Sequence, residues 1–286
     1  MEIWVLLNPA VKLASYALSF FASGAVMFYF HFQKLLTIET KLYCHILIFK
    51  LSISGMIISI LLFLSVAGNI GGDLGSIINT TMLLLAAQIS LGKSALASFL
   101  GFTMLLISAK TKGVLNLFVK TSAAGLILLS FVLVGHSTIN GFPTQVLIYI
   151  HLICISYWIG SFLPLLAICK MGNAVELHNV AMKFGKLAIF YISLLIVAGF
   201  LFSYILLGDL NLLFTTEYGN ILLLKISCVA LLLGLGAVNK YRLVPNIKFN
   251  FEDSQKKLSR SIRIEIVFVL CVLFFTSILT TSVELP

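Results

Sequence analysis

The stretch LSISGMIISILLFLSVA (Leu51–Ala67) contains no charged side chain. It lies inside an apolar segment, residues 43–67, and a helix needs ~20 mostly apolar residues to cross a bilayer. The rest of the 286-residue chain is similar, with 60% hydrophobic residues, 10% charged residues and a mean hydropathy of +1.11. Soluble domains are about half apolar and about a quarter charged. The composition therefore excludes a soluble enzyme, a disordered protein and a fibrous protein, and predicts a polytopic membrane protein.

Eight stretches are long and apolar enough to span a bilayer. Backbone groups must be paired within lipid, so these stretches are predicted to be helices. The fold class is therefore an all-α integral membrane protein with eight transmembrane helices, in a single transmembrane domain over residues 1–286. The spans are expected at residues 12–32, 43–67, 91–109, 114–134, 147–168, 187–207, 220–239 and 262–282.

The basic residues predict the orientation of these spans. Alternate loops carry the Lys and Arg residues, whereas residues 68–80, 135–145 and 208–219 contain none. Loops rich in Lys and Arg stay in the cytoplasm, so both termini are expected in the periplasm. The net charge of +9 then reports topology, and we expect no nucleic-acid binding. Residues 1–8 lack a basic start and a cleavage site, so we expect no removable signal peptide. The basic loops hold Lys34, Lys41, Lys110, Lys112, Lys170, Lys183, Lys186, Lys240, Arg242, Lys248, Lys256, Lys257, Arg260 and Arg263.

An internal similarity suggests that the chain is a parallel repeat of two four-helix halves, 1–140 and 141–286. Gly-Asp-Leu opens the loop after the second span at residues 72–74 and the loop after the sixth span at residues 208–210. Four spans separate the copies, so both halves have the same orientation. Parallel repeats occur in transporters. The alternative is that the two copies are unrelated, because Gly-Asp is common where a helix ends.

Two histidines are expected on adjacent helices at the outer face of the membrane. His136 (VGHST) ends the fourth span and His151 (YIHLICISYWIG) begins the fifth. Cys154 and Trp158 follow His151 at helical spacing, so they share one stripe. Two imidazoles and a thiolate suit Cu(I), whereas imidazoles alone also suit Zn(II) or Cu(II). The alternative is that the histidines hydrogen-bond across the helix pair and that Cys154 only packs.

Other polar groups within the spans have weaker signals. His31 and His45 flank the first cytoplasmic turn and could form an inner site or a metal exit, although interfacial histidines are common. Lys225 lies deep in its span, so its charge needs a partner or a water-filled cavity. Its role could be structural or functional. Glu265 is the acid we place within a span.

Four segments resemble the bacterial copper resistance D family, CopD/PcoD. The segment GHSTINGFPTQVLIYIHLICISYWIGSFLPL (Gly135–Leu165) is similar to the family block GHA…HLLAAALWLGGLLPL. The segments TTEYGNILLLKISC, AVNKYRLVPNI and LSRSIRIEI look like three further family patterns in the same order. The resemblance covers the fourth to the eighth span, and covers the first three only through topology.

The resemblance implies a multi-pass protein of the bacterial inner membrane that handles copper. It implies metal ligands at His136 and His151, and pathway or structural roles at Trp158, Lys225 and Asn239. Cys154 stands where the family has small residues, so a ligand role there is not inherited. Copper, as Cu(I) rather than Cu(II), would bind at the periplasmic face and move toward the cytoplasm. A separate periplasmic carrier of the CopC type is an implied partner.

The competing interpretation is a b-type cytochrome that carries electrons across the membrane. His136 with His151, and His31 with His45, could each hold a haem, but axial imidazoles lie on opposite sides of the ring, and one short loop suits that poorly. A membrane sensor or assembly partner is a third class. The chain has no phosphate-binding loop, dinucleotide fingerprint, HExxH or GxSxG motif, so we expect no enzyme.

Overall fold

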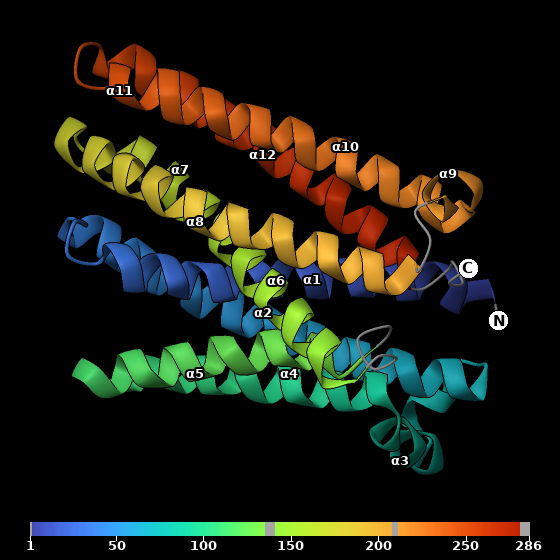
Figure 1. Ribbon diagram of the computed structural model, residues 1–286. Coiled ribbons are helices and arrows are strands. Elements are labelled where there is room, and N and C mark those ends of the chain that lie inside the picture. Colours follow the sequence, from blue (N-terminus) through green and yellow to red (C-terminus); the bar gives the residue numbers. More distant parts are fainter. Residues whose placement is uncertain (1, 135–140, 208–210, 281–286) are drawn as a thin grey trace.

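The computed structural model describes residues 2–134, 141–207 and 211–280, and the elements in these ranges are helices. Eight of the described helical segments are long and apolar enough to cross a membrane, which confirms the predicted fold class (Figure 1). The longer helices are α1 (Glu2–Phe32), α2 (Ile38–Gly71), α3 (Thr80–Gln88), α4 (Ser90–Ile107), α5 (Gly113–Val132), α6 (Phe142–Gly160), α7 (Phe162–Met171), α8 (Ala174–Leu207), α10 (Glu217–Val238) and α12 (Phe251–Leu279). The short ones are η1 (Gly75–Ile78), η2 (Ser108–Lys110), α9 (Leu212–Thr215), η4 (Asn239–Leu243) and α11 (Val244–Asn246).

Three helices begin well before the apolar stretches that predicted them: α1, at Glu2 and not at residue 12, and two helices in the second half of the chain. The sixth span was expected from residue 187 and the eighth from residue 262, but α8 begins at Ala174 and α12 at Phe251. The added turns are polar, and the Asn250 side chain caps α12 by accepting a hydrogen bond from the backbone N–H of Asp253 at 3.3 Å. Hydropathy detects only the part of a helix that lies in lipid, whereas capped polar turns continue the helix into water.

Helix α1 lies between the two halves of the chain. It packs against α2 and α5, and α4 contacts both of these helices, so the first four spans surround a common interior (Figure 1). On its other side α1 contacts α6 and α12, while α8 packs on α6 and α10 packs on α12. Side chains of α1 and of the second-half helices therefore share one large buried cluster. The repeat of two halves stays a prediction.

The crossing of α1 and α6 depends on two glycines. A Cβ atom added to Gly24 would lie 2.0 Å from the carbonyl oxygen of Ser156, and one added to Gly160 would lie 2.3 Å from the Cα of Gly24. Ser156 and Gly160 form a small-xxx-small pair, which allows helix backbones to approach closely in membranes. This contact fixes α6, which belongs to the most buried of the eight described spans, Phe142–Met171, against α1.

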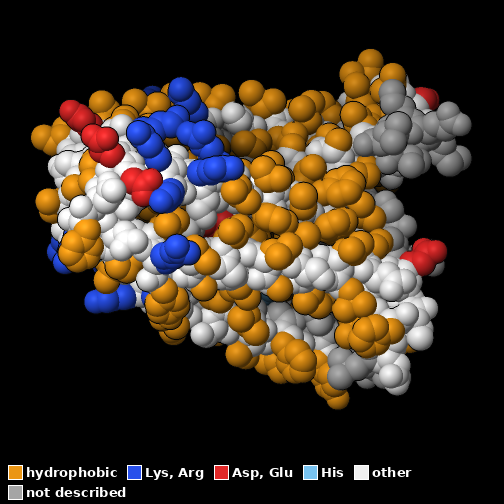
Figure 2. All heavy atoms as spheres, turned by 90° about the horizontal axis from the view of Figure 1, so that it is seen from above, with side chains coloured by type: hydrophobic (Ala, Val, Ile, Leu, Met, Phe, Trp, Pro, Cys, Tyr) orange, Lys and Arg blue, Asp and Glu red, His pale blue; other side chains and the backbone are white. Residues whose placement is uncertain are grey.

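Positive charge gathers at one end of the molecule. Helix α1 begins and α12 ends at the same end (Figure 1). On the face in Figure 2 the Lys and Arg side chains cluster at the opposite end, and a broad hydrophobic surface covers the rest. This is the distribution expected of helices whose basic ends lie on one side of a bilayer.

Candidate functional site

His151 lies deeper in the fifth span than the sequence predicted. The span was expected from residue 147, but α6 begins at Phe142, so His151 lies roughly 14 Å along the helix at ~1.5 Å per residue. Its Nδ1 atom is 3.2 Å from the carbonyl oxygen of Leu195 on α8. A carbonyl can only accept, so Nδ1 donates its hydrogen and Nε2 keeps its lone pair. This arrangement is typical of a histidine whose second nitrogen binds a metal.

The His151 imidazole fits against α8 because Gly199 has no side chain. A Cβ atom at residue 199 would lie 2.9 Å from Cε1 and 3.2 Å from Nδ1 of His151. Gly199 and Leu195 lie one turn apart on α8, so one supplies the space and the other supplies the hydrogen-bond acceptor. The two helices therefore fix the position and the tautomer of this imidazole.

Cys154 lies one turn from His151 on α6 and is buried. It is close enough to Tyr191 of α8 for the two groups to interact electrostatically. The Tyr191 ring stacks on the Tyr157 ring with centroids 4.0 Å apart. The predicted stripe on α6 thus continues across the contact with α8.

His31 of α1 completes a row of side chains along the contact of α1, α6 and α8. Its Nε2 atom is hydrogen-bonded to the Tyr191 hydroxyl at 3.1 Å, and its ring contacts the edge of Tyr157. We name these side chains the histidine–tyrosine row, which consists of His151, Cys154, Tyr157, Tyr191 and His31. The row joins one of the histidines expected outside to one of those expected inside.

His136, the second predicted outer ligand, lies outside the described residues. Within the described ranges, no three His, Cys, Asp or Glu side chains are grouped so that they could hold a metal ion. A metal site at His151 therefore needs a ligand beyond those ranges or a second group from the row. Trp158 is buried in the large cluster that also contains Cys154 and Tyr157 of the row.

Lys225 of α10 is half-buried, and its charge acts on His151. None of the described residues forms a hydrogen bond or an ion pair with it. Lys225 therefore brings a positive charge to the outer part of the row.

Asn239 pairs with Glu265, the acid that we placed within a span. Its side-chain Nδ2 donates to Glu265 Oε1 on α12, and both residues are buried. Asn239 begins η4, a π-helical segment that connects the end of α10 to α11. π-bulges often occur at functional sites, and here the bulge turns an amide toward a buried carboxyl group. The pair joins α10 to α12.

His45 has different neighbours from His31. Its Nδ1 atom lies 3.1 Å from Nζ of Lys120 on α5, and its ring packs against Tyr29 at a centroid distance of 4.7 Å. Tyr29 and His31 are two residues apart on α1, which places them on nearly opposite faces of that helix. His31 and His45 therefore contact different helices in the structure.

Asp73 keeps a negative charge in the loop after α2. Its carboxylate accepts hydrogen bonds from the hydroxyl and the backbone N–H of Ser76, at 2.8 and 2.7 Å, and these bonds lower the pKa of Asp73. The carboxylate therefore stays ionised to lower pH than an ordinary aspartate does. It lies at the end of the molecule where α1 begins.

Sequence reasoning missed several side chains of these groups. Lys120 is an ionisable residue inside an apolar run (LFVKTSAA), and this signal was sufficient to identify it. Tyr157 and Tyr191 carried no signal, because tyrosine is common in membrane helices. Glu176 was expected in a loop, but it is buried at the start of α8.

Eight apolar helices with polar side chains buried between them define a multi-pass membrane protein. Residues 178–279 match the family model of copper resistance protein D, CopD, which confirms the resemblance over these residues. The segment 135–165, which carries His136 and His151, lies outside this match. The inner membrane protein YebZ of Escherichia coli (strain K12) is 31% identical over 139 residues, which cover 46% of this chain and 47% of YebZ. The chain thus matches about half the length of this relative. No solved structure matches the chain.

Proposed function

We propose that this protein is a copper transport protein of the bacterial inner membrane. Copper is its cargo, and the ion enters on the side of the termini and moves toward the cytoplasm. The observation that carries the proposal is the histidine–tyrosine row, because it links soft and polar groups from His151 to His31 along one helix contact. The CopD match over residues 178–279 and the inner-membrane relative support the same assignment.

His151 is the first ligand in this proposal. Its Nδ1 is occupied by the Leu195 carbonyl, so Nε2 is the nitrogen that can bind the ion. His136 is the second ligand, and the Cys154 thiol one turn further provides a soft group that favours Cu(I) over Cu(II). Asp73 and the neighbouring loops, which lack Lys and Arg, attract the cation to this side.

The rest of the row carries the ion inward. Tyr191 and His31 lie beyond Cys154, and the ion passes them on its way to the basic end of the molecule. The Lys225 charge disfavours long residence of a cation near His151, which speeds transfer and limits affinity. A separate periplasmic carrier of the CopC type delivers copper to the entrance.

The test is copper binding by purified protein, measured by Cu(I) competition against a chromogenic chelator. The protein should bind about one copper tightly, and the His136→Ala/His151→Ala double variant should lose it while its melting temperature stays the same. His178→Ala is the matched control, because His178 is a half-buried histidine of α8 that contacts the carbonyl of Val244 and not the row.

Tight copper retained by the double variant would contradict the site. A visible spectrum of the same samples distinguishes a copper protein from a b-type cytochrome. A Soret band without bound copper would show that the protein binds haem, and its function would then be electron transfer. Copper uptake into proteoliposomes tests transport, and His31→Ala should slow uptake at least tenfold while copper stays bound at His151.

A further inference from the structure

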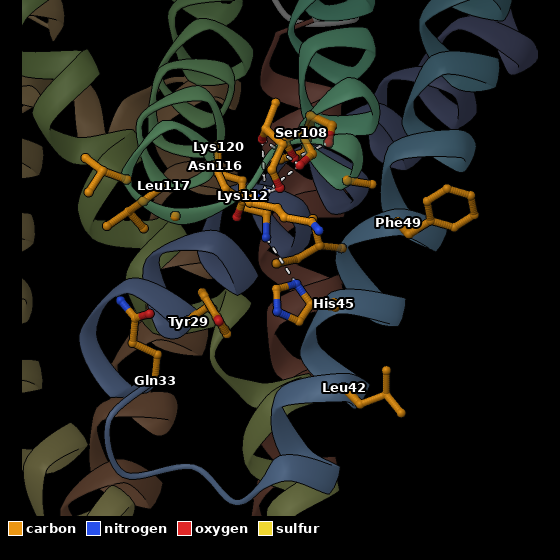
Figure 3. A pocket seen from close by; sticks show the side chains of 16 residues that line it. Tyr29, Gln33, Leu42, His45, Phe49, Ser108, Lys112, Asn116, Leu117 and Lys120 are labelled. Atoms are coloured by element: carbon orange, nitrogen blue, oxygen red, sulfur yellow. Dashed lines mark hydrogen bonds between the residues drawn. The ribbon is translucent and has the colours of Figure 1, made fainter.

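A basic cavity lies at the end of the first four spans where the turns between α1 and α2 and between α4 and α5 are found. It has a volume of about 750 Å³ and is lined by residues of α1, α2, α4, η2 and α5 (Figure 3). In Figure 3 the side chains of Lys112, the N-cap residue of α5, and Lys120, two turns further along this helix, extend toward His45 on α2. The cavity is separate from the histidine–tyrosine row, because Tyr29 faces the cavity while His31 faces α8.

The cavity contains positive charge and no acid. Among the described residues that line it, two are lysines and none is Asp or Glu. Lys120 is only 3% exposed, and its neighbours include Nδ1 of His45, the face of the Tyr29 ring, 5.1 Å from Nζ, and the Cys44 thiol. A buried ammonium is costly unless an anion compensates it. The nearby Glu176 carboxylate is occupied by Thr37 and Thr40 and does not line the cavity.

The start of α5 adds backbone donors to the same place. Lys112 is the N-cap residue of α5, and its side chain makes no capping hydrogen bond. The first N–H groups of a helix have no acceptor within the helix, and the helix dipole is positive there. Helix starts of this kind bind phosphate groups, and here the start of α5 lines the same cavity as Lys112, Lys120 and His45.

The rim of the cavity is apolar and exposed. Val114 is 86% exposed, Leu42 is 59% exposed and Phe49 is 45% exposed. A cavity that is cationic inside and apolar at its rim matches a molecule with an anionic head and hydrocarbon chains. Basic pockets between transmembrane helices on the cytoplasmic side bind such headgroups.

We propose that this cavity binds the phosphate group of an anionic phospholipid from the cytoplasmic leaflet. Lys120 contacts the phosphate from within, Lys112 contacts it from the rim, and the first N–H groups of α5 donate to it. His45 accepts from Lys120 through Nδ1, so its Nε2–H is a further donor. The acyl chains lie along Leu42, Phe49 and Val114.

The test is native mass spectrometry of the full chain in a mild detergent, with phosphatidylglycerol, phosphatidylcholine of the same acyl chains, or inorganic phosphate added. Phosphatidylglycerol should bind at least tenfold more tightly than phosphatidylcholine. Lys120→Met should weaken phosphatidylglycerol binding about tenfold. Lys50→Met, which removes an exposed lysine of α2 that does not line the cavity, should leave it unchanged.

Equal phosphatidylglycerol binding by the wild type and Lys120→Met would overturn the proposal. Displacement of the lipid by inorganic phosphate at equal concentration would assign the site to free phosphate and would overturn the lipid assignment. If Lys120→Met does not fold, Lys112→Met at the exposed rim is the second variant. It should weaken binding about fivefold, and unchanged binding would contradict the proposal.

Discussion

At the scale of single residues, Gly199 controls how closely the His151 imidazole lies against α8. Gly199→Ala would put a Cβ atom 2.9 Å from Cε1, so the ring must move by a few tenths of an ångström. Alanine favours a helix over glycine by up to ~1 kcal/mol, so the melting temperature should stay the same or rise. We expect copper affinity to fall about tenfold, which corresponds to ~1.4 kcal/mol, in the same Cu(I) competition.

Gly234→Ala is the matched control for this prediction. It is also a glycine of a transmembrane helix, but beyond the nearby backbone of α10 no atom of the described residues lies within 4 Å of the added Cβ. Copper affinity should be unchanged in this variant. Wild-type affinity in Gly199→Ala would show that the imidazole position does not matter for the ion, and His151 would then lose its role as a ligand.

At the scale of the elements, Glu176 joins the starts of α2 and α8. Its carboxylate accepts hydrogen bonds from the backbone N–H of Thr37 at 2.8 Å and from the Thr40 hydroxyl at 2.5 Å. Thr37 is the N-cap residue of α2, so a carboxylate from another helix compensates the positive end of α2. This contact connects the two halves of the chain at the basic end of the molecule.

Glu176→Ala should destabilise the protein by about 2 kcal/mol, because the half-buried N–H of Thr37 and the buried hydroxyl of Thr40 lose this acceptor. We expect the melting temperature in detergent to fall by several degrees. Glu39→Ala is the control, since Glu39 is exposed in the first turn of α2 and forms no hydrogen bond or ion pair with the other described helices. Equal melting temperatures for both variants would mean that Glu176 does not link the elements.

The spans and the α6 stripe could be predicted from the sequence, while the contacts between helices could not. Apolar length is a local signal, and so is the spacing of His151 and Cys154 on one helix face. The neighbours that α8 provides, Leu195, Gly199 and Tyr191, depend on which faces of two helices meet, and the chain carries no local pattern for that. The first turns of α8, which contain Glu176, were not predicted to be helical because hydropathy detects only the part of a helix that lies in lipid.

At the scale of the whole molecule, the separation of charge determines which way the row points. The basic residues gather at the end opposite the start of α1, and the row runs from His151 toward that end through His31. The positive-inside rule assigns the basic end to the cytoplasm. The proposed inward movement of copper therefore depends on the orientation of the whole helix bundle.

Two exposed side chains at opposite ends allow this orientation to be measured. Ile78 in η1 is 81% exposed, and Phe249, next to Lys248 before α12, is 88% exposed. Ile78→Cys should react with a membrane-impermeant maleimide in intact spheroplasts, whereas Phe249→Cys should react only after lysis. The wild type is the background control, because three of its five cysteines are buried. The reverse labelling pattern would show that the helix bundle has the opposite orientation in the membrane. The histidine–tyrosine row would then begin on the cytoplasmic side, and the proposed direction of copper movement would be wrong.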